Sequence, residues 1–294
     1  TVDCFLQKLT NSLVWGSLNA LMAAGYTMTF GIIGLVNFAH GEVMMVGALT
    51  AFWVMIILKL PFWIGCLAAL LGSIAVGLFI ERIAFKPLRG AGMISLFITS
   101  LAASFGIRTL FIMIFTDRVK PFPVPEFLQG AFLLGNLILF KKTVLILLLT
   151  LVVCGLVIYF VKYTKTGAAM RAMSYDPEIA ATMGVPTERI IIVVFAMASF
   201  LAGLAAIFWG IKFGSVRCSM GVIMVVNAFI ASVLGGIGNV SGAIVAGYII
   251  GIGETLFVAY LPDHLVGLRP LFVWIVLFML LIFKPSGLFR PNIK

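Results

Sequence analysis

Three polar residues, Asn37, His40 and Glu42, interrupt the apolar stretch GIIGLVNFAHGEVMMVGA that runs from Gly31 to Ala48. Asn37 and His40 are three positions apart, so they share a face if the segment is helical. Amide and ionisable groups are costly inside a bilayer unless they face a bundle interior or a watery cavity, which makes all three candidates for a gate or for the lining of a transport path. The alternative is that they form hydrogen bonds with neighbouring helices or lie at the membrane surface.

A second group of polar residues surrounds a glycine-rich region further along the chain. Asn227 and Ser232 precede most of these glycines and Glu254 follows them, so all three are further candidates for the path. Hydrogen bonding between helices also explains such residues, and Glu254 fits a helix end equally well. Arg108, the one basic residue well inside an apolar span, could meet Glu42, in which case a structural ion pair is as good an interpretation as a role in transport.

Signatures of catalysis are missing from the sequence. It contains neither a G-x-x-x-x-G-K-[ST] nucleotide-binding loop nor an H-E-x-x-H helix. Two histidines, His40 and His264, offer little material for a catalytic dyad, and the four cysteines show no C-x-x-C spacing. We therefore expect no catalytic residue, no metal site and no cofactor in this chain.

The residues that position these side chains belong to a membrane protein. Of the 294 residues, 63% are hydrophobic and 10% are charged, far below the roughly 25% charged residues of soluble domains. The net charge of +10 would suit nucleic acid only if the basic residues formed a stripe, and they do not. Lys and Arg at helix ends contact lipid phosphates instead, so membrane lipid is the expected partner and nucleic acid is not.

Apolar runs of about 20 residues can each cross the bilayer as a helix. The fold class is therefore an all-α, polytopic bundle with eight to ten spans, in a single transmembrane domain covering 1–294. Glycine-rich junctions suggest that some spans are broken or re-entrant. The nine expected spans are 10–30, 36–58, 62–80, 93–116, 143–161, 190–211, 221–237, 241–260 and 269–283.

An internal repeat is indicated by a shift of 204 positions. This offset aligns residues 24–51 with 228–255 without gaps and gives seven identities in 28 positions, in a chain rich enough in Gly, Ala and Ile for chance to supply a few. Several identities are glycines within interrupted apolar runs. Paired interrupted segments point to the substrate path of a transporter.

Three connections between the spans are long, at 81–92, 117–142 and 162–189. Pro121, Pro123 and Pro125 favour extended backbone in the second, which we expect to lie over the membrane surface as a cap, a docking ledge or a passive linker. Nine alternating spans place 81–92, 162–189 and the tail 284–294 on one side. That side holds ten Lys and Arg residues against nine on the other, so charge leaves the orientation open.

The connection 162–189 has the composition of a docking segment. Asp176 and Pro177 fit the cap and first turn of a helix that stops at Gly184, so we expect two short helices at the membrane surface. Their small residues suit packing into a groove on another protein. The alternative is an ordinary interfacial loop, which would explain the amphipathic pattern but not why Ala and Gly replace the usual Lys-rich or Ser-rich composition.

Several stretches of the sequence together resemble the LivH-type permeases of bacterial branched-chain amino acid ABC importers. The resemblance covers nearly the whole chain, and the string NFAHGE is its most specific part. The stretches are GYTMTFGIIGLVNFAHGEVMMVGA (Gly25 to Ala48), TGAAMRAMSYDPEIAATMGVPTERI (Thr166 to Ile190), VLGGIGNVSGAIVAGYIIGIGE (Val233 to Glu254) and the tail KPSGLFRP (Lys284 to Pro291).

The resemblance implies a permease in a bacterial inner membrane that works with a homologous LivM-like permease subunit, two ABC ATPase subunits and an extracytoplasmic substrate-binding protein. It also implies that 162–189 is the cytoplasmic coupling segment and that 117–142 lies outside. Candidate coupling residues are Arg171 and Asp176, with Glu178, Ala180, Ala181 and Gly184 similar to the EAA motif of permeases at an altered spacing.

Other functions stay open at this point. Within the same family, the cargo could be urea, an amide or another amino acid in place of a branched-chain amino acid. An ion-coupled secondary carrier would use Glu42, His40 and Arg108 as a relay and would work without ATP. A structural membrane scaffold would tolerate replacement of Asn37 or His40.

Overall fold

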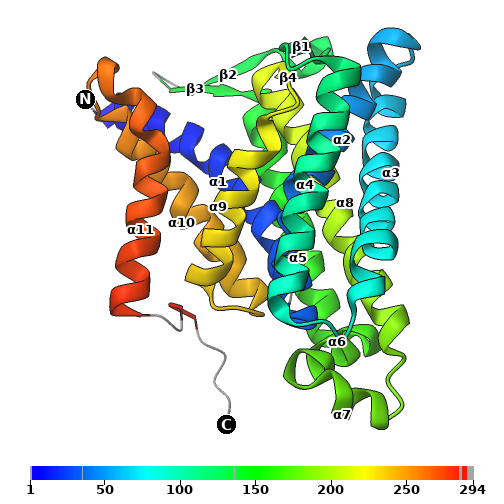
Figure 1. The fold of residues 1–294 in the computed structure, drawn as a ribbon. Coiled ribbons are helices and arrows are strands. Elements are labelled where there is room, and N and C mark those ends of the chain that lie inside the picture. The colour runs from blue at the N-terminus through cyan, green and yellow to red at the C-terminus, as the bar shows by residue number, and fades with distance from the viewer. Residues whose placement is uncertain (1, 35, 135–136, 285–286, 290–294) are drawn as a thin grey trace.

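The chain folds into a bundle of long helices, shown in Figure 1. The computed structural model describes residues 2–34, 36–134, 137–284 and 287–289. Each of the nine expected spans is helical. They are α1 (Val2–Ile33), α2 (His40–Phe52) with the π-helical turn η1 (Trp53–Ile57), α3 (Phe62–Ile80), α4 (Met93–Phe115), α5 (Lys141–Tyr163), α8 (Thr187–Phe213), α9 (Met220–Gly235), α10 (Val240–Ala259) and α11 (Arg269–Phe283).

Length and hydropathy separate these helices into two groups. Seven are long and apolar enough to cross a membrane, namely α2, α3, α4, α5, α8, α10 and α11 with the short turns that extend some of them. The other two are α1, which has 32 residues, and α9, which has 16. The all-α membrane bundle expected from composition is therefore confirmed.

Helix α1 lies at the centre of the bundle, where small residues let another helix approach its backbone. Gly16 and Ala20 on α1 face Gly251 and Gly247 on α10, and an added Cβ at either α10 glycine would meet the α1 backbone. Small residues four apart on two facing helices are a recurrent packing motif in membranes. In contrast, only 11% of the apolar windows of α4 and α11 is buried, as expected for helices with a lipid-facing or partner-facing surface.

The two halves of the expected repeat share one local architecture. Residues 24–51 contain the end of α1, a break at 34–39 and α2, and residues 228–255 contain the end of α9, a break at 236–239 and α10. Gly34 and Gly238, which the offset of 204 pairs, both adopt positive φ (68° and 82°) within these breaks. In Figure 1, α1 and α9 run away from the end of the bundle marked N, and α2 and α10 return toward it.

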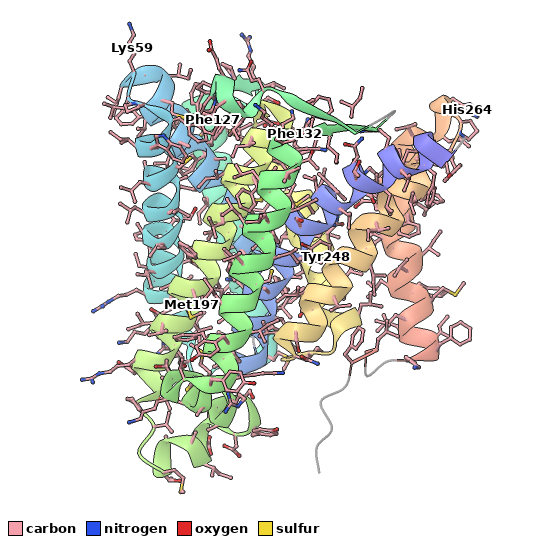
Figure 2. All side chains as sticks on the ribbon, turned by 180° about the vertical axis from the view of Figure 1, so that it is seen from behind. Lys59, Phe127, Phe132, Met197, Tyr248 and His264 are labelled. Carbon is pink, nitrogen blue, oxygen red and sulfur yellow. The ribbon has the colours of Figure 1, made fainter. Side chains whose placement is uncertain are left out.

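A cap of short strands covers the end of the bundle that carries the N-terminus. Strand β1 (Lys120–Pro121) pairs with β4 (Ser215–Val216), and β2 (Ala131–Leu134) pairs with β3 (Leu137–Phe140), with the 3₁₀ turn η4 (Glu126–Leu128) between β1 and β2. The side chain of Phe122 is 2% exposed. The proline-rich connection is thus extended near β1, as expected, but its hairpin was not predicted. Figure 2 shows Phe127, Phe132 and Lys59 at this end, with Tyr248 inside the bundle.

The opposite end gathers the other two long connections. The segment after α3 forms η2 (Glu81–Phe85) and η3 (Lys86–Leu88), and two short helices follow α5, α6 (Lys165–Tyr175) and α7 (Pro177–Thr182). Glu188 at the start of α8 forms ion pairs with Lys86 (3.3 Å) and Arg89 (3.7 Å). These contacts place 81–92 and 162–189 side by side, and α11 also ends at this side of Figure 1. Of the tail motif, residues 285–286 and 290–291 lie outside the described residues.

Candidate functional site

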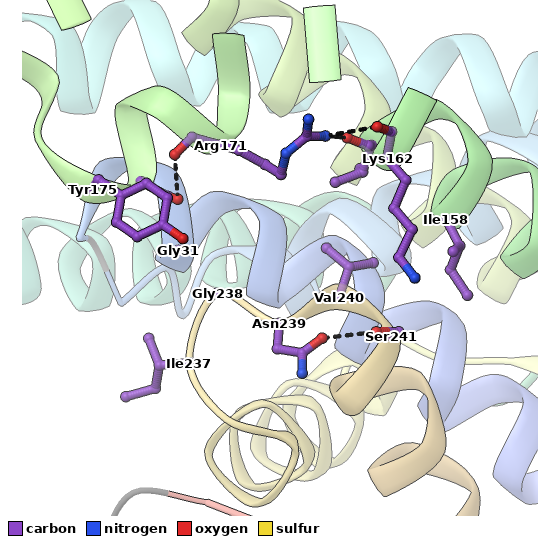
Figure 3. A pocket seen from close by; sticks show the side chains of 12 residues that line it. Gly31, Ile158, Lys162, Arg171, Tyr175, Ile237, Gly238, Asn239, Val240 and Ser241 are labelled. Carbon is purple, nitrogen blue, oxygen red and sulfur yellow. Dashed lines mark hydrogen bonds between the residues drawn. The ribbon is translucent and has the colours of Figure 1, made fainter. Parts of the chain in front are cut away.

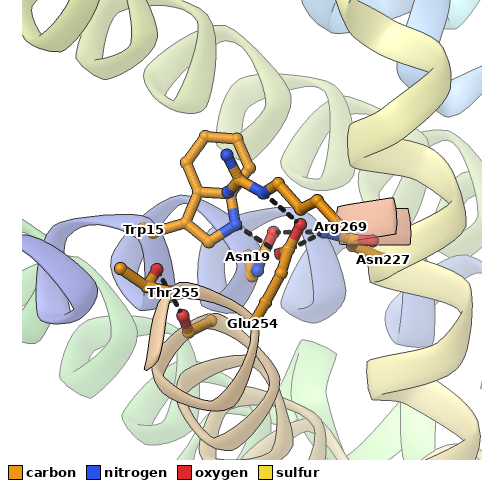
Figure 4. Close-up of polar contacts among 7 residues, drawn as sticks. Trp15, Asn19, Asn227, Glu254, Thr255 and Arg269 are labelled. Carbon is orange, nitrogen blue, oxygen red and sulfur yellow. Dashed lines mark hydrogen bonds and ion pairs between the residues drawn. The ribbon is translucent and has the colours of Figure 1, made fainter. Parts of the chain in front are cut away.

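Glu254 is the centre of a buried polar cluster that joins four helices. Its side chain is 1% exposed. Oε2 accepts hydrogen bonds from Trp15 Nε1 of α1 (2.5 Å) and Asn227 Nδ2 of α9 (3.1 Å), and Oε1 accepts one from Arg269 Nε of α11 (2.7 Å). Figure 4 shows these contacts together with Asn19, whose Oδ1 lies 3.5 Å from Asn227 Nδ2. A carboxylate at this depth is tolerated because three donors satisfy it, and one of them, Arg269, is a cation.

The structure brings together two of the residues named from the sequence, Asn227 and Glu254, and adds Trp15, Asn19 and Arg269. Arg269 begins the last apolar span and therefore looked like an ordinary lipid-facing basic residue. Trp15 and Asn19 lie more than 200 positions away in the sequence, and only the packing of α1 against α9 and α10 shows that they are neighbours.

Asn37, His40 and Glu42 lie at the junction of the first break with α2, deep in the packed core, with 3%, 1% and 1% exposure. His40 packs against α1, where a Cβ added at Gly25 would lie 3.0 Å from its ring. Asn37 Oδ1, His40 Nε2 and Glu42 Oε2 form no hydrogen bond with any residue that the structure describes. These orphaned polar atoms contrast with the Glu254 carboxylate, both of whose oxygens accept hydrogen bonds.

The suggested pairing of Glu42 with Arg108 is not seen. Glu42 Oε1 accepts a hydrogen bond from Ser104 Oγ of α4 (3.1 Å). Arg108 forms no ion pair within the described part of the chain, and its guanidinium lies 4.8 Å from the centre of the Phe105 ring. Ser232 is fully buried on α9, and its Oγ also finds no partner among the described residues. The six candidates for the path therefore fall into one satisfied cluster and several separate buried groups.

Two candidate coupling residues serve the local structure of α6 and α7. The Arg171 guanidinium donates to the carbonyl oxygens of Val161 and Lys162 and so caps the C-terminus of α5. Asp176 Oδ1 accepts from the backbone N–H groups of Glu178 (2.8 Å) and Ile179 (3.0 Å), which confirms its role as the N-cap of α7.

The other four coupling candidates differ in exposure. Ala180 is 4% exposed and packs inward. Glu178, Ala181 and Gly184 are exposed, and Gly184 ends the helical segment with a positive φ of 84°. Only Glu178 and Ala181, of the six coupling candidates, are exposed without ending or capping a helix.

An exposed apolar row on α6 and α7 was missed in the sequence. Tyr175, Ile179 and Met183 are spaced four residues apart and are 73%, 63% and 81% exposed. Tyr175 ends α6, Ile179 lies within α7 and Met183 follows α7. The extended Asp176 separates the first from the other two. The signal available in the sequence was three large apolar residues in a connection rich in small and polar residues. Exposed apolar side chains of this kind mark a contact with another protein or with the membrane surface. We call these three residues the apolar row.

Helix α6 faces the second helix break across a cavity of about 440 Å³. Figure 3 shows Arg171 and Tyr175 of α6 on one side, Gly238 and Asn239 of the break on the other, and Gly31 of α1 nearby. Asn239 caps α10 through Gly242 N (3.1 Å). Helix α6 therefore borders the same cavity as the break, and it packs directly against α1.

Metal and thiol chemistry receive no support from the placement of side chains. No group of three or more His, Cys, Asp and Glu residues is arranged to hold a metal ion among the described residues. Cys66 of α3, Cys154 of α5 and Cys218 in the turn before α9 are free thiols.

Comparisons with known proteins agree with this geometry. The family described as branched-chain amino acid transport system / permease component matches residues 8–284. The high-affinity branched-chain amino acid transport system permease protein LivH of Salmonella typhimurium is 30% identical over 99% of this chain and 97% of LivH. BraD of Pseudomonas aeruginosa, a permease protein with the same description, is 32% identical over 99% of this chain and 97% of BraD.

A solved structure supports the fold. An ABC transporter of metal-chelate type in an inward-facing conformation superimposes with a TM-score of 0.57, over 94% of this chain and 87% of that one. The two sequences are 14% identical, so the likeness concerns architecture alone.

Proposed function

This chain belongs to the family of branched-chain amino acid transport permease components, and from that premise we propose that it is a membrane-spanning subunit of an ATP-driven importer for branched-chain or related hydrophobic amino acids. The observation that carries the proposal is the family match over residues 8–284. The helical bundle, with seven helices fit to cross a membrane, supports it. The relatives are bacterial permeases, so the proposed location is the inner membrane, as a multi-pass protein.

In this proposal ATP is hydrolysed on partner subunits. The sequence has no nucleotide-binding loop of its own. The assembly would contain a second, LivM-like permease subunit, two ABC ATPases and an extracytoplasmic protein that delivers the amino acid. The end carrying α6 and α7 would face the cytoplasm and the ATPases, and the β-strand cap would face the delivering protein. Selection of the cargo would rest mainly on that protein.

The apolar row provides the coupling contact in this mechanism. Tyr175, Ile179 and Met183 would insert into grooves on the ATPases, and closure of the ATPases on ATP would displace α6 and α7. The seam between α6 and the 236–239 break, supported by Gly31 of α1, would carry this displacement into the bundle. A small shift of a packed element produces a discrete rearrangement because cores are close-packed.

The six polar residues named from the sequence as path candidates would act once the displacement of α6 and α7 has reached the bundle. Asn227 and Glu254 hold α9 and α10 to α1 and α11, so they define one wall beside the path. Asn37, His40, Glu42 and Ser232 are buried in this conformation, and they would meet the cargo only after the broken segments rearrange.

The coupling contact is tested by Ile179→Glu in the complete importer. We expect the variant to insert and assemble normally, because Ile179 is 63% exposed, while stimulation of ATP hydrolysis by loaded binding protein falls to the basal rate. The matched control is Ile83→Glu, an isoleucine of η2 at the same end that is 59% exposed and lies outside the apolar row. It should keep the stimulation. Full stimulation in Ile179→Glu, or equal loss in both variants, would show that the apolar row is not the coupling contact.

A further inference from the structure

A second cavity, of about 350 Å³, lies beside the Glu254 cluster and extends to Arg217, the residue that follows β4 of the cap. Residues of α1, α8, α9, α10 and α11 line it. Its volume lies within the range of about 300–1,000 Å³ that small-molecule sites occupy. It is separate from the seam between α6 and the second break, with which it shares no lining residue.

One wall of this cavity is aromatic and apolar. The ring centres of Trp15 and Trp209 are 5.5 Å apart, and Phe213 lies 4.6 Å from Trp209 and 5.8 Å from Trp15. Val226 and Val273 continue the wall from α9 and α11. Such a surface gains free energy by covering a branched aliphatic side chain, because apolar area leaves water.

The polar wall carries two guanidinium groups and one carboxylate. Arg269 uses Nε to bind Glu254 and stacks 4.1 Å from the Trp15 ring centre. Its two terminal nitrogens form no hydrogen bond within the described residues, and neither does the side chain of Arg217, which also lines the cavity. Arg217, Arg269 and Glu254 together give the cavity wall a net charge of +1. A guanidinium fork held in place by a second side chain is suited to a carboxylate.

An acceptor for a positive group lies on the same wall. Asn227 donates its Nδ2 to Glu254, and its Oδ1 accepts no hydrogen bond from the described residues. The cavity therefore offers donors for an anion, an acceptor for a cation and an apolar surface between helices. Those three features match the three parts of an apolar amino acid.

We propose that this cavity is a binding site for an apolar L-amino acid within the permease itself, a proposal that rests on the function above. The α-carboxylate binds Arg217 and the terminal nitrogens of Arg269, the ammonium group faces Asn227 Oδ1, and the side chain lies against Trp15, Trp209 and Phe213. Glu254 is a positioning residue, since it fixes Arg269 and has its own oxygens occupied by donors. The site would receive the amino acid after its release from the binding protein.

The test is equilibrium binding of radiolabelled L-leucine to the complete importer in nanodiscs, without binding protein. L-Leucinamide, which lacks the carboxylate, serves as competitor and should bind at least about tenfold more weakly than L-leucine. Arg217→Gln should weaken L-leucine by about tenfold and leave L-leucinamide unchanged, because only the carboxylate contact is lost. Arg118→Gln, an exposed arginine at the same end but outside the cavity, is the control and should bind as the unmodified importer does. Arg269→Lys, which keeps the charge beside Glu254 but loses the fork, should also weaken L-leucine.

Other outcomes overturn the proposal. The first is equal affinity for L-leucine and L-leucinamide. The second is unchanged L-leucine binding in Arg217→Gln. The third is no L-leucine binding together with phosphatidylglycerol that co-purifies in an Arg217-dependent manner, which would identify a lipid site. ATP-driven uptake of L-leucine by the same importer with its binding protein separates this failure from failure of the proposed function. If the unmodified importer takes up L-leucine and Arg217→Gln keeps its KM, the inference is wrong and the function stands; if the unmodified importer takes up none, the function itself is wrong.

Discussion

At the scale of single residues, Glu254 shows how an apolar bundle holds a charge. Removing a carboxylate from water costs several kcal/mol, and the cost is offset only when hydrogen bonds and a counter-charge satisfy it. Trp15, Asn227 and Arg269 supply these contacts from three different helices. The cluster consequently ties α1, α9, α10 and α11 together, and its loss would loosen the attachment of α11, which is otherwise little buried.

Variants of the Glu254–Arg269 ion pair should differ in stability in a defined order. Arg269→Ala leaves a buried carboxylate without its cation and should lower the free energy of unfolding by about 3 kcal/mol. Glu254→Gln keeps the shape and an acceptor for Trp15, and should cost about 1 kcal/mol. The double variant Arg269→Ala/Glu254→Gln leaves no unpaired charge. Its loss in free energy of unfolding should therefore be smaller than the sum of the losses in the two single variants. Unfolding in detergent, followed by tryptophan fluorescence, measures all three, and a simple sum would contradict the pairing.

At the scale of elements, close approach of backbones explains where glycines occur. The first turns of α2 and α9 meet at Gly41 and Gly221, and a Cβ on either glycine would overlap the backbone of the other. Small residues permit such contacts in membrane bundles, where packing rather than burial from water drives association. Burial also differs between two adjacent small residues of α7. Ala180 packs against the bundle, whereas Ala181 faces outward.

The close approach predicts a contrast between two helical glycines. Gly41→Ala should destabilise the bundle by about 1–3 kcal/mol, because the methyl group forces α2 and α9 apart. Gly106→Ala on α4 is the matched control, since nothing lies within 4 Å of an added Cβ there. It should leave stability unchanged or raise it by up to about 1 kcal/mol through helix propensity. Thermal unfolding followed by size-exclusion chromatography compares them, and equal stability of the two variants would contradict the predicted contact.

At the scale of the whole molecule, apolar run length predicted the helices well and long-range contacts poorly. All nine expected spans are helices, and Asp176, Pro177 and Gly184 mark α7 as expected, because these signals are local. The β2–β3 hairpin was missed because its residues are apolar and carry no strand alternation that distinguishes them from a span. Arg269 was missed because ion pairs depend on which helices pack together. Glu42 does contact α4, the helix of Arg108, but its hydrogen bond comes from Ser104, one turn away from that arginine. The numbers of Lys and Arg on the two sides, ten and nine, did not determine which side faces the cytoplasm.

The central claim, an ATP-driven importer subunit, is tested most directly by uptake of radiolabelled L-leucine into proteoliposomes that contain the complete importer. Leucine should accumulate only when ATP is inside the vesicles with the ATPase subunits, and binding protein is outside. Collapse of proton and sodium gradients should leave the rate unchanged. Urea and short amides in the same assay test the cargo assignment. Leucine uptake by this chain alone, driven by an ion gradient in the absence of ATP, would contradict the account and identify a secondary carrier.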